Sequence, residues 1–231
     1  MKKSWLVCIL SLLLCISCLS CSPLRTGAFA YVNSSHNREE TVSKVKKIYI
    51  DNAFGEADLL SIQDAIDQWT YALNGYMVFD IRSFDPVGGS LVPREEAARG
   101  DAWLFMKIDS SNYILAQHDN RPAGMVALAF CDYVGGNLMY VVRDRIDNDQ
   151  VRGIVMHEMG HLLGAKHVNE DADLMAPSYD NINAQCIDRT TLMQIAKTQG
   201  FPFQNMNYCI YSDDTMKKSG AKEASAKHFV D

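Results

Sequence analysis

Apolar positions along the first half of the chain follow two different spacings. Residues 45–50, 76–84 and 102–108 are short apolar or alternating runs, which are typical of β-strands. Residues 55–73 carry apolar side chains three and four positions apart, which predicts a long amphipathic helix that ends before Gly75. The pattern therefore predicts the order strand, helix, strand, strand.

Two further helical patterns lie in the second half. Residues 151–163 have apolar side chains at three- and four-residue spacing, and no proline interrupts them. Residues 188–199 carry a similar apolar face and predict a final helix. From residue 212 the chain is polar and rich in lysine, which predicts a disordered tail over residues 212–231.

Composition limits the number of domains and the kinds of partner. The chain has 231 residues, of which 48% are hydrophobic, so it can bury one substantial core. Its net charge of -6 is small and the charged residues are dispersed, which gives no nucleic-acid-binding surface. We therefore expect one compact domain over residues 44–211 that is monomeric and binds no nucleic acid.

The N-terminus has the pattern of an export signal. Two lysines precede an apolar run over residues 5–19, which is too short to span a membrane comfortably. Cys21 follows in a loose lipobox, so we predict a signal peptide over residues 1–21 and lipidation of Cys21. Lipidation at Cys18 and ordinary cleavage after Ala30 are the alternatives. Each of the three predicts that the protein is exported.

Residues between the leader and the domain, 22–43, are polar and predict a flexible tether. Beyond the leader three cysteines remain, and an exported protein permits disulfides. A bond between Cys186 and Cys209 would hold the C-terminal segment. Cys131 is then expected to be a buried, reduced thiol.

The most informative stretch is residues 157–167, His-Glu-Met-Gly-His-Leu-Leu-Gly-Ala-Lys-His. Because His157 and His161 are four residues apart, they share one face of the predicted helix and can present two nitrogens to one metal ion. Gly164 can end the helix in a left-handed conformation and turn the chain, which brings His167 back as a third ligand. Three histidines leave the fourth position of a tetrahedral zinc open for water, as in catalytic sites.

Glu158 supplies the other group that such chemistry needs. Zinc lowers the pKa of a bound water to about 7, and a neighbouring carboxylate can take the proton as the water attacks a carbonyl. The same carboxyl group can later pass the proton to the leaving amine. The residues therefore predict a catalytic Zn²⁺ and hydrolysis of an amide bond, with Glu158 as general base and acid.

The extended motif resembles the signature of the metzincin metallopeptidases, HExxHxxGxxH, which is followed by a methionine turn. Leu174–Tyr179 follows the third histidine closely and is similar to that turn in the matrixins, a branch of the metzincins. The resemblance implies that Met175 forms the floor beneath the metal. It also implies that Pro177 and Tyr179 contribute to the wall of the pocket for the substrate side chain beyond the scissile bond.

Two segments upstream resemble the last strands of the matrixin sheet. Residues 124–130 resemble the edge strand, along which an extended peptide lies by β-augmentation. The residues that the resemblance predicts to bind substrate there are Val126, Ala127, Leu128 and Ala129. Residues 135–140 resemble the next strand. Matrixins carry a histidine on each of these strands for a second, structural zinc, and the matching positions here are Leu128 and Met139, which predicts a single zinc.

These observations predict an α+β metzincin domain: a twisted, mixed five-stranded sheet, two long helices above the cleft, and a small C-terminal subdomain with one helix. The predicted function is that of an exported zinc-dependent endopeptidase, which cuts extended protein substrates and is tethered to a lipid bilayer by its N-terminus. The residues leave two alternatives open: a peptide-binding surface protein with a vestigial zinc site, and a zinc amidase acting on peptidoglycan peptides. Ca²⁺ is compatible with such a domain, although the sequence assigns no residue to it.

Overall fold

The computed structural model describes residues 29–32, 43–116, 126–130, 137–168, 173–179, 186–211 and 227–228. The predicted leader with Cys21, and also Cys131, lie outside these ranges. In the part of the chain that is described, no helix has the length and hydropathy needed to cross a membrane.

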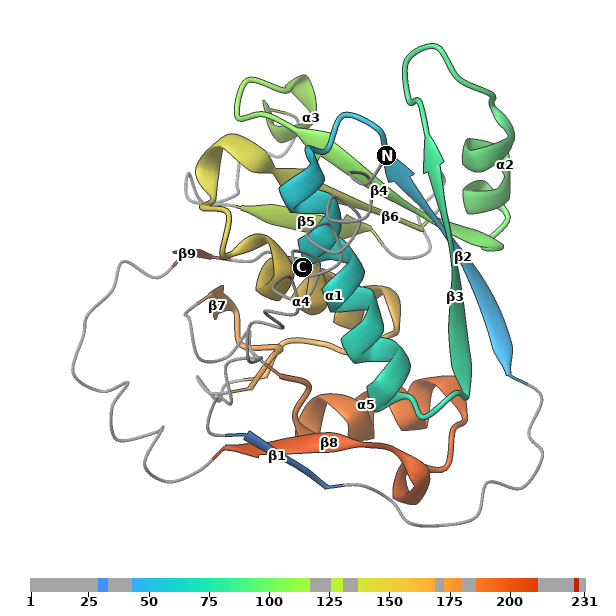
Figure 1. Cartoon of the computed structure of the whole chain (residues 1–231), viewed down its shortest axis with the longest axis vertical. Coiled ribbons are helices and arrows are strands. Elements are labelled where there is room, and N and C mark those ends of the chain that lie inside the picture. Colours follow the sequence, from blue (N-terminus) through green and yellow to red (C-terminus); the bar gives the residue numbers. More distant parts are fainter. Residues whose placement is uncertain are drawn as a thin grey trace, which may run out of the picture.

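A five-stranded sheet organises the domain (Figure 1). Its strands are β2 (Lys44–Asp51), β3 (Met77–Phe84), β4 (Ala102–Ile108), β5 (Ala127–Phe130) and β6 (Asn137–Val142). Their spatial order is β3-β2-β4-β6-β5, and β5 alone runs antiparallel to its neighbour, at the edge of the sheet. The predicted fold class, α+β with a mixed five-stranded sheet, is confirmed.

Two helices cover one face of this sheet, α1 (Glu56–Ala72) and α4 (Val151–Leu162) (Figure 1). The apolar stripe predicted for α1 is buried from Ile62 onward, and Trp69 is fully enclosed in the main core, whereas Leu59 and Leu60 in the first turns are exposed. Its indole N–H donates a hydrogen bond to the carbonyl of Met156, with the atoms 3.1 Å apart. This bond and the surrounding core tie α4 to α1, so that α4 is held as a rigid element.

The opposite face of the sheet is covered in part by a short helix, α2 (Val92–Ala98). Glu96 accepts hydrogen bonds from the ammonium of Lys47 and the hydroxyl of Tyr49, each over 2.7 Å, which fixes α2 to β2. The sequence pattern does not predict this helix, because a proline such as Pro93 is as typical of a loop as of the start of a helix. A proline in the first turn of a helix removes no intrahelical hydrogen bond, and Pro93 lies in that turn.

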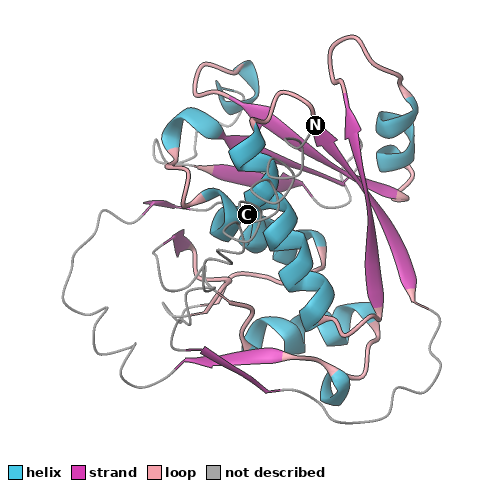
Figure 2. Cartoon of the chain, viewed as in Figure 1, coloured by secondary structure: helices cyan, strands magenta, loops and turns pink. Residues whose placement is uncertain are grey.

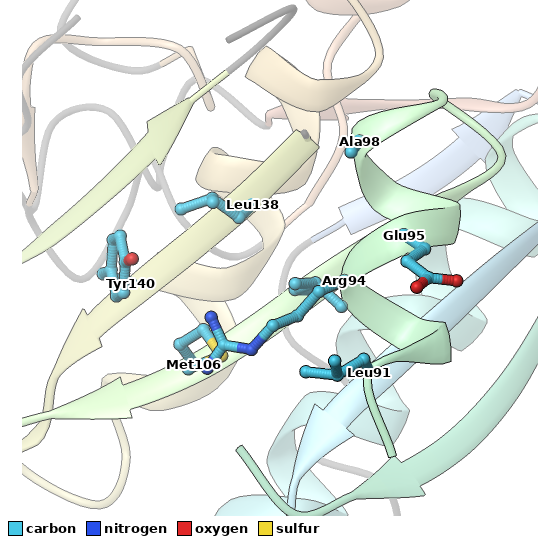
Figure 3. Close-up of a pocket in the computed structure, with 8 residues that line it drawn as sticks. Leu91, Arg94, Glu95, Ala98, Met106, Leu138 and Tyr140 are labelled. Atoms are coloured by element: carbon cyan, nitrogen blue, oxygen red, sulfur yellow. The ribbon is translucent and has the colours of Figure 1, made fainter. Parts of the chain in front are cut away.

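A pocket of about 380 Å³ lies beside α2 on this outer face (Figure 3). Its lining residues are Leu91, Arg94, Glu95, Ala98, Leu104, Met106, Leu138 and Tyr140. Arg94 extends from α2 over the strands, as Figure 3 shows. Because α1 and α4 pack on the other face, this pocket does not contain the histidines of the HExxH motif.

Beneath the sheet lies a smaller part built around α5 (Arg189–Gln199) (Figure 2). The strand pair β8 (Tyr208–Tyr211) with β1 (Phe29–Val32) lies next to α5. A separate two-stranded pair is formed by β7 (Ser178–Tyr179) and β9 (Lys227–His228). The remaining short elements are α3 (Tyr113–Ala116) and two 3₁₀ turns, η1 (Arg143–Arg145) and η2 (Phe203–Asn205). The sequence pattern predicts no strand at β1 or β9.

A disulfide joins Cys186 to Cys209, whose Cα atoms are 6.1 Å apart. The amide of Cys209 also donates to the carbonyl of Ile187 over 3.0 Å, so the bond lies beside a backbone contact. Together they attach β8 to the segment that enters α5. The structure thus contains the pairing that the sequence had suggested for these two cysteines.

The register of β5 against β6 shows how the two positions that carry structural-zinc histidines in matrixins are arranged here. Leu128 is directly opposite Tyr140, whereas Met139 is opposite Ala129 and is fully buried in the main core. Positions 128 and 139 are therefore not paired across the two strands. The residue across from Leu128 is a tyrosine, so this pair also lacks the two histidines of a structural zinc site.

Candidate active site

Helix α4 carries the first two histidines of the motif. His157 is completely buried and His161 is 9% exposed. Because they are one helical turn apart, their rings project from the same face and their centroids are 4.8 Å apart. The local sequence places them there because the apolar positions of α4 turn the helix toward the core, with Ile154, Val155 and Met159 all fully buried.

The third histidine reaches the same point through a reversal of the chain at Gly164. This residue has φ +100, a conformation that favours glycine, and its amide donates to the carbonyl of His161 over 2.8 Å. The amide of Ala165 donates to the carbonyl of Gly160 over 2.9 Å and completes the turn. His167 follows as a half-buried residue, as the sequence predicted from the position of the glycine.

The three Nε2 atoms converge on one point. His157 Nε2 lies 3.1 Å from that of His161 and 3.1 Å from that of His167, and the last two are 3.2 Å apart. Nitrogen ligands about 2.0–2.1 Å from a tetrahedral zinc are themselves about 3.3 Å apart. The spacing of the three nitrogens therefore fits a single zinc ion, and the three histidines form the only metal-binding cluster found among the described residues.

Backbone carbonyls fix which ring nitrogen is available to a metal. Nδ1 of His157 lies 2.7 Å from the carbonyl oxygen of Leu174, and Nδ1 of His161 lies 3.0 Å from that of Ala165. A carbonyl oxygen can only accept a hydrogen bond, so the Nδ1 atom of each of these two rings carries the proton and the Nε2 atom carries a lone pair. Lone pairs this close repel one another, and a cation between them removes the repulsion.

Burial keeps His157 uncharged at neutral pH. Loss of hydration in the core lowers its pKa well below the ordinary 6.5, and the neighbouring rings of His161 and His167 lower it further, against a smaller opposing contribution from the Leu174 carbonyl. Protons and zinc compete for the same nitrogen. Because the pKa is lowered, the ring is in the metal-binding form throughout the physiological range.

Glu158 is the next residue on α4 and is fully buried. Its position in the helix is adjacent to the first ligand, so its carboxyl group belongs to the same helical turn as His157 and His161. It is not one of the three residues whose nitrogens converge. Its carboxyl group is therefore separate from the three nitrogens that are suited to hold a metal ion.

Met175 lies in a turn after the third histidine and is fully buried. Its carbonyl accepts from the amide of Val168 over 2.9 Å, and the amide of Ala176 donates to Asp173 O over 3.1 Å. The side chain packs beneath α4 at Gly160: a Cβ atom on that glycine would lie 2.4 Å from the Met175 sulfur. The methionine thus occupies the space that a side chain at position 160 would need.

Gly160→Ala should therefore destabilise the protein even though alanine favours helices. Overpacking a closed core costs about 1–3 kcal/mol, against a gain of up to about 1 kcal/mol in helix propensity. We expect the free energy of unfolding, measured by urea denaturation, to fall by about 1–2 kcal/mol. In a double-mutant cycle with Met175→Ala the two changes should be strongly coupled; additive effects would contradict the contact.

The residues predicted to bind substrate lie in two places. Val126, just before β5, and Ala127, its first residue, are buried, and among the described strands only β6 pairs with β5, on one side. Pro177 is exposed just after the methionine turn, and Tyr179 belongs to β7. The structure brings the three histidines together on one side of α4, with Glu158 on the same helix, and it places β5 next to α4.

A model of the matrixin family matches residues 64–194, which is more than half of the chain and includes the whole HExxH helix. The chain belongs to the matrixin family. As a matrixin it is a zinc metallopeptidase, and zinc is the metal that its three histidines are suited to hold. The resemblance drawn from residues 157–179 is thereby confirmed at the level of the family.

Solved structures similar to this matrixin include two archaeal proteins. Archaemetzincin from Methanopyrus kandleri is 14% identical, with a TM-score of 0.45, and the alignment covers 68% of this chain and 96% of that one. A zinc-dependent peptidase from Methanocorpusculum labreanum is 11% identical, with a TM-score of 0.36 and coverage of 75% and 98%. Comparison with curated proteins gave no match.

Three groups around the matrixin site were not predicted from the sequence: the carbonyls of Leu174 and Ala165, and the carboxylate of Asp188. The first two orient ligand rings. Asp188 accepts from the amide of Leu174 over 2.7 Å. Any residue offers a carbonyl, so the sequence holds no signal for the first two. The sequence does indicate Asp188 as the N-cap of α5, but it gives no indication of the hydrogen bond from the amide of Leu174.

Proposed function

We propose that this matrixin is an endopeptidase that cuts extended segments of protein chains. The observation that carries the proposal is the convergence of three histidine nitrogens, two of them from the helix that also carries the buried carboxyl group of Glu158. The histidines fit a zinc ion through three positions and leave a fourth for water. Such an ion polarises the scissile carbonyl and acidifies the water when bound.

Proton transfer and the orientation of the imidazoles are the roles of the chain's own residues. Glu158 takes a proton from the attacking water and delivers it to the amine that leaves, which requires a carboxylate first and a carboxylic acid afterwards. Burial of Glu158 and His157 excludes bulk water, so proton transfer takes place between fixed groups. Leu174 and Ala165 hold two imidazoles in the orientation that this requires.

The edge of the sheet supports an extended substrate. In the described part of the chain, β5 is paired on one side and packs near α4, so a peptide strand added along its other edge would pass the histidines. Main-chain hydrogen bonds supply affinity in this mode for many sequences, and side-chain pockets add selectivity. We assign this role to the backbone of Val126–Ala129, with Pro177 and Tyr179 on the far side of the scissile bond.

Digestion of casein with and without a zinc chelator tests this function. The zinc-loaded protein should shorten casein, the chelator should stop the reaction, and added Zn²⁺ should restore it while added Ca²⁺ should not. Profiling the products against a peptide library then gives the preferred side chains. A protein that captures casein peptides without shortening them would be a binding module, and the proposal would be wrong.

A further inference from the structure

Asp188 is a buried carboxylate, 4% exposed, that caps the N-terminus of α5. Its two oxygens have different partners. Oδ1 accepts from the amide of Thr191 over 2.7 Å, which is the ordinary capping bond. Oδ2 accepts from the hydroxyl of Thr191 over 2.8 Å and from the amide of Leu174 over 2.7 Å.

The bond to Leu174 leads directly to the metal site. The amide of Leu174 is held by Asp188, and the carbonyl of the same residue accepts the Nδ1 proton of His157 over 2.7 Å. The next residue, Met175, accepts through its carbonyl from the amide of Val168, which follows the third ligand. The segment Leu174–Met175 is therefore held by α5 through the amide of Leu174. Its two carbonyls accept hydrogen bonds from His157 and from the residue that follows His167.

Capping alone does not account for this arrangement. A helix N-cap needs a single acceptor, and Oδ1 serves as that acceptor. Oδ2 instead satisfies a buried amide 14 residues away in the sequence. A buried amide that loses its acceptor costs about 1–3 kcal/mol, and the segment would shift to find another one.

We infer that Asp188 is a positioning residue of the zinc site: its carboxylate fixes Leu174, and Leu174 orients the imidazole of His157. The inference rests on the proposed zinc-binding role of the three histidines. Partners that orient a ligand histidine change metal affinity by about 10–100-fold when they are removed. Asp188 acts one bond further out, through the backbone of Leu174.

The variant Asp188→Asn separates the two roles, because it is almost the same size. Its amide oxygen can still cap α5 at Thr191, whereas its NH₂ group would face the amide of Leu174, donor against donor. We expect circular dichroism to show unchanged helix content. Zinc affinity, measured by competition with a chromogenic chelator, should fall about 10-fold or more, and the visible spectrum of the Co²⁺-loaded protein should shift.

Thr191→Val is the matched control. It removes the hydroxyl bond to the same Oδ2 and has a similar shape, but it leaves the amide of Leu174 bonded. Its zinc affinity should stay within about 3-fold of the wild type. Asp188→Ser, which can cap α5 but is too short to hold Leu174, should behave as Asp188→Asn does.

Wild-type zinc affinity in folded Asp188→Asn would overturn the inference, as would an equal loss in Thr191→Val. If both Asp188 variants fail to fold, Asp188 is a stability residue and the positioning role is wrong. Because the readout is metal affinity, the result is distinct from a failure of the proposed peptidase activity. A wild-type protein that binds zinc but cuts nothing would leave this inference standing.

Discussion

Replacing Glu158 by glutamine is expected to leave zinc binding intact and to lower kcat by about 10²–10⁴-fold. Glutamine has the same shape, so the buried position on α4 remains filled. It cannot take a proton from water, however, and the three nitrogens that converge belong to other residues. The measurement is kcat on a fluorogenic peptide, together with bound zinc determined by atomic absorption.

Glu158→Asp gives the matched control, since it keeps the carboxylate and withdraws it by one methylene group. It should retain more activity than the glutamine variant and should recover part of its activity at higher pH, where more of the attacking water is already deprotonated. Full activity in Glu158→Gln would show that another group takes the proton, and the assigned mechanism would then be wrong.

Replacing His161 by alanine should remove both zinc and activity. This change deletes one of three nitrogens that lie 3.1–3.2 Å apart. It also leaves the ordered carbonyl of Ala165 without its ring partner. The loss of zinc affinity should exceed the ~10–100-fold loss that follows removal of an outer partner of a ligand. Chelator competition and peptide cleavage measure the two effects separately.

Lys166→Ala is the control for this change. Lys166 lies between Gly164 and the third histidine, but its side chain is exposed. The truncation should leave the zinc affinity and kcat close to their wild-type values. A His161→Ala protein that keeps stoichiometric zinc would contradict the three-histidine site, because two remaining histidines would then have to suffice.

Local periodicity explains why the centre of the site was predictable. Helical spacing alone places His157 and His161 on one face, and a glycine at position 164 indicates the turn that returns His167. These positions depend on residues close together in sequence. The strands β2, β3 and β4 were predicted for the same reason, and β4 has the same bounds as expected.

Contacts between distant segments account for what the sequence did not predict. The bond from Asp188 to Leu174 depends on how α5 docks, which no local pattern encodes. The pairing of Leu128 with Tyr140, and not with Met139, depends on register, where a slip of one residue exchanges the two faces. Helix α2 was missed because one proline is compatible with a loop and with a helix start.

The chain reversal at Gly164 makes the metal a local cross-link. His157 and His167 are separated by 10 positions, so an ion that joins them closes only a short loop. The entropy of closing such a loop is small beside the burial of α1, α4 and the sheet, which does not depend on it. We therefore expect this domain to fold without zinc and to bind the ion afterwards, whereas a zinc finger needs its metal ion in order to fold.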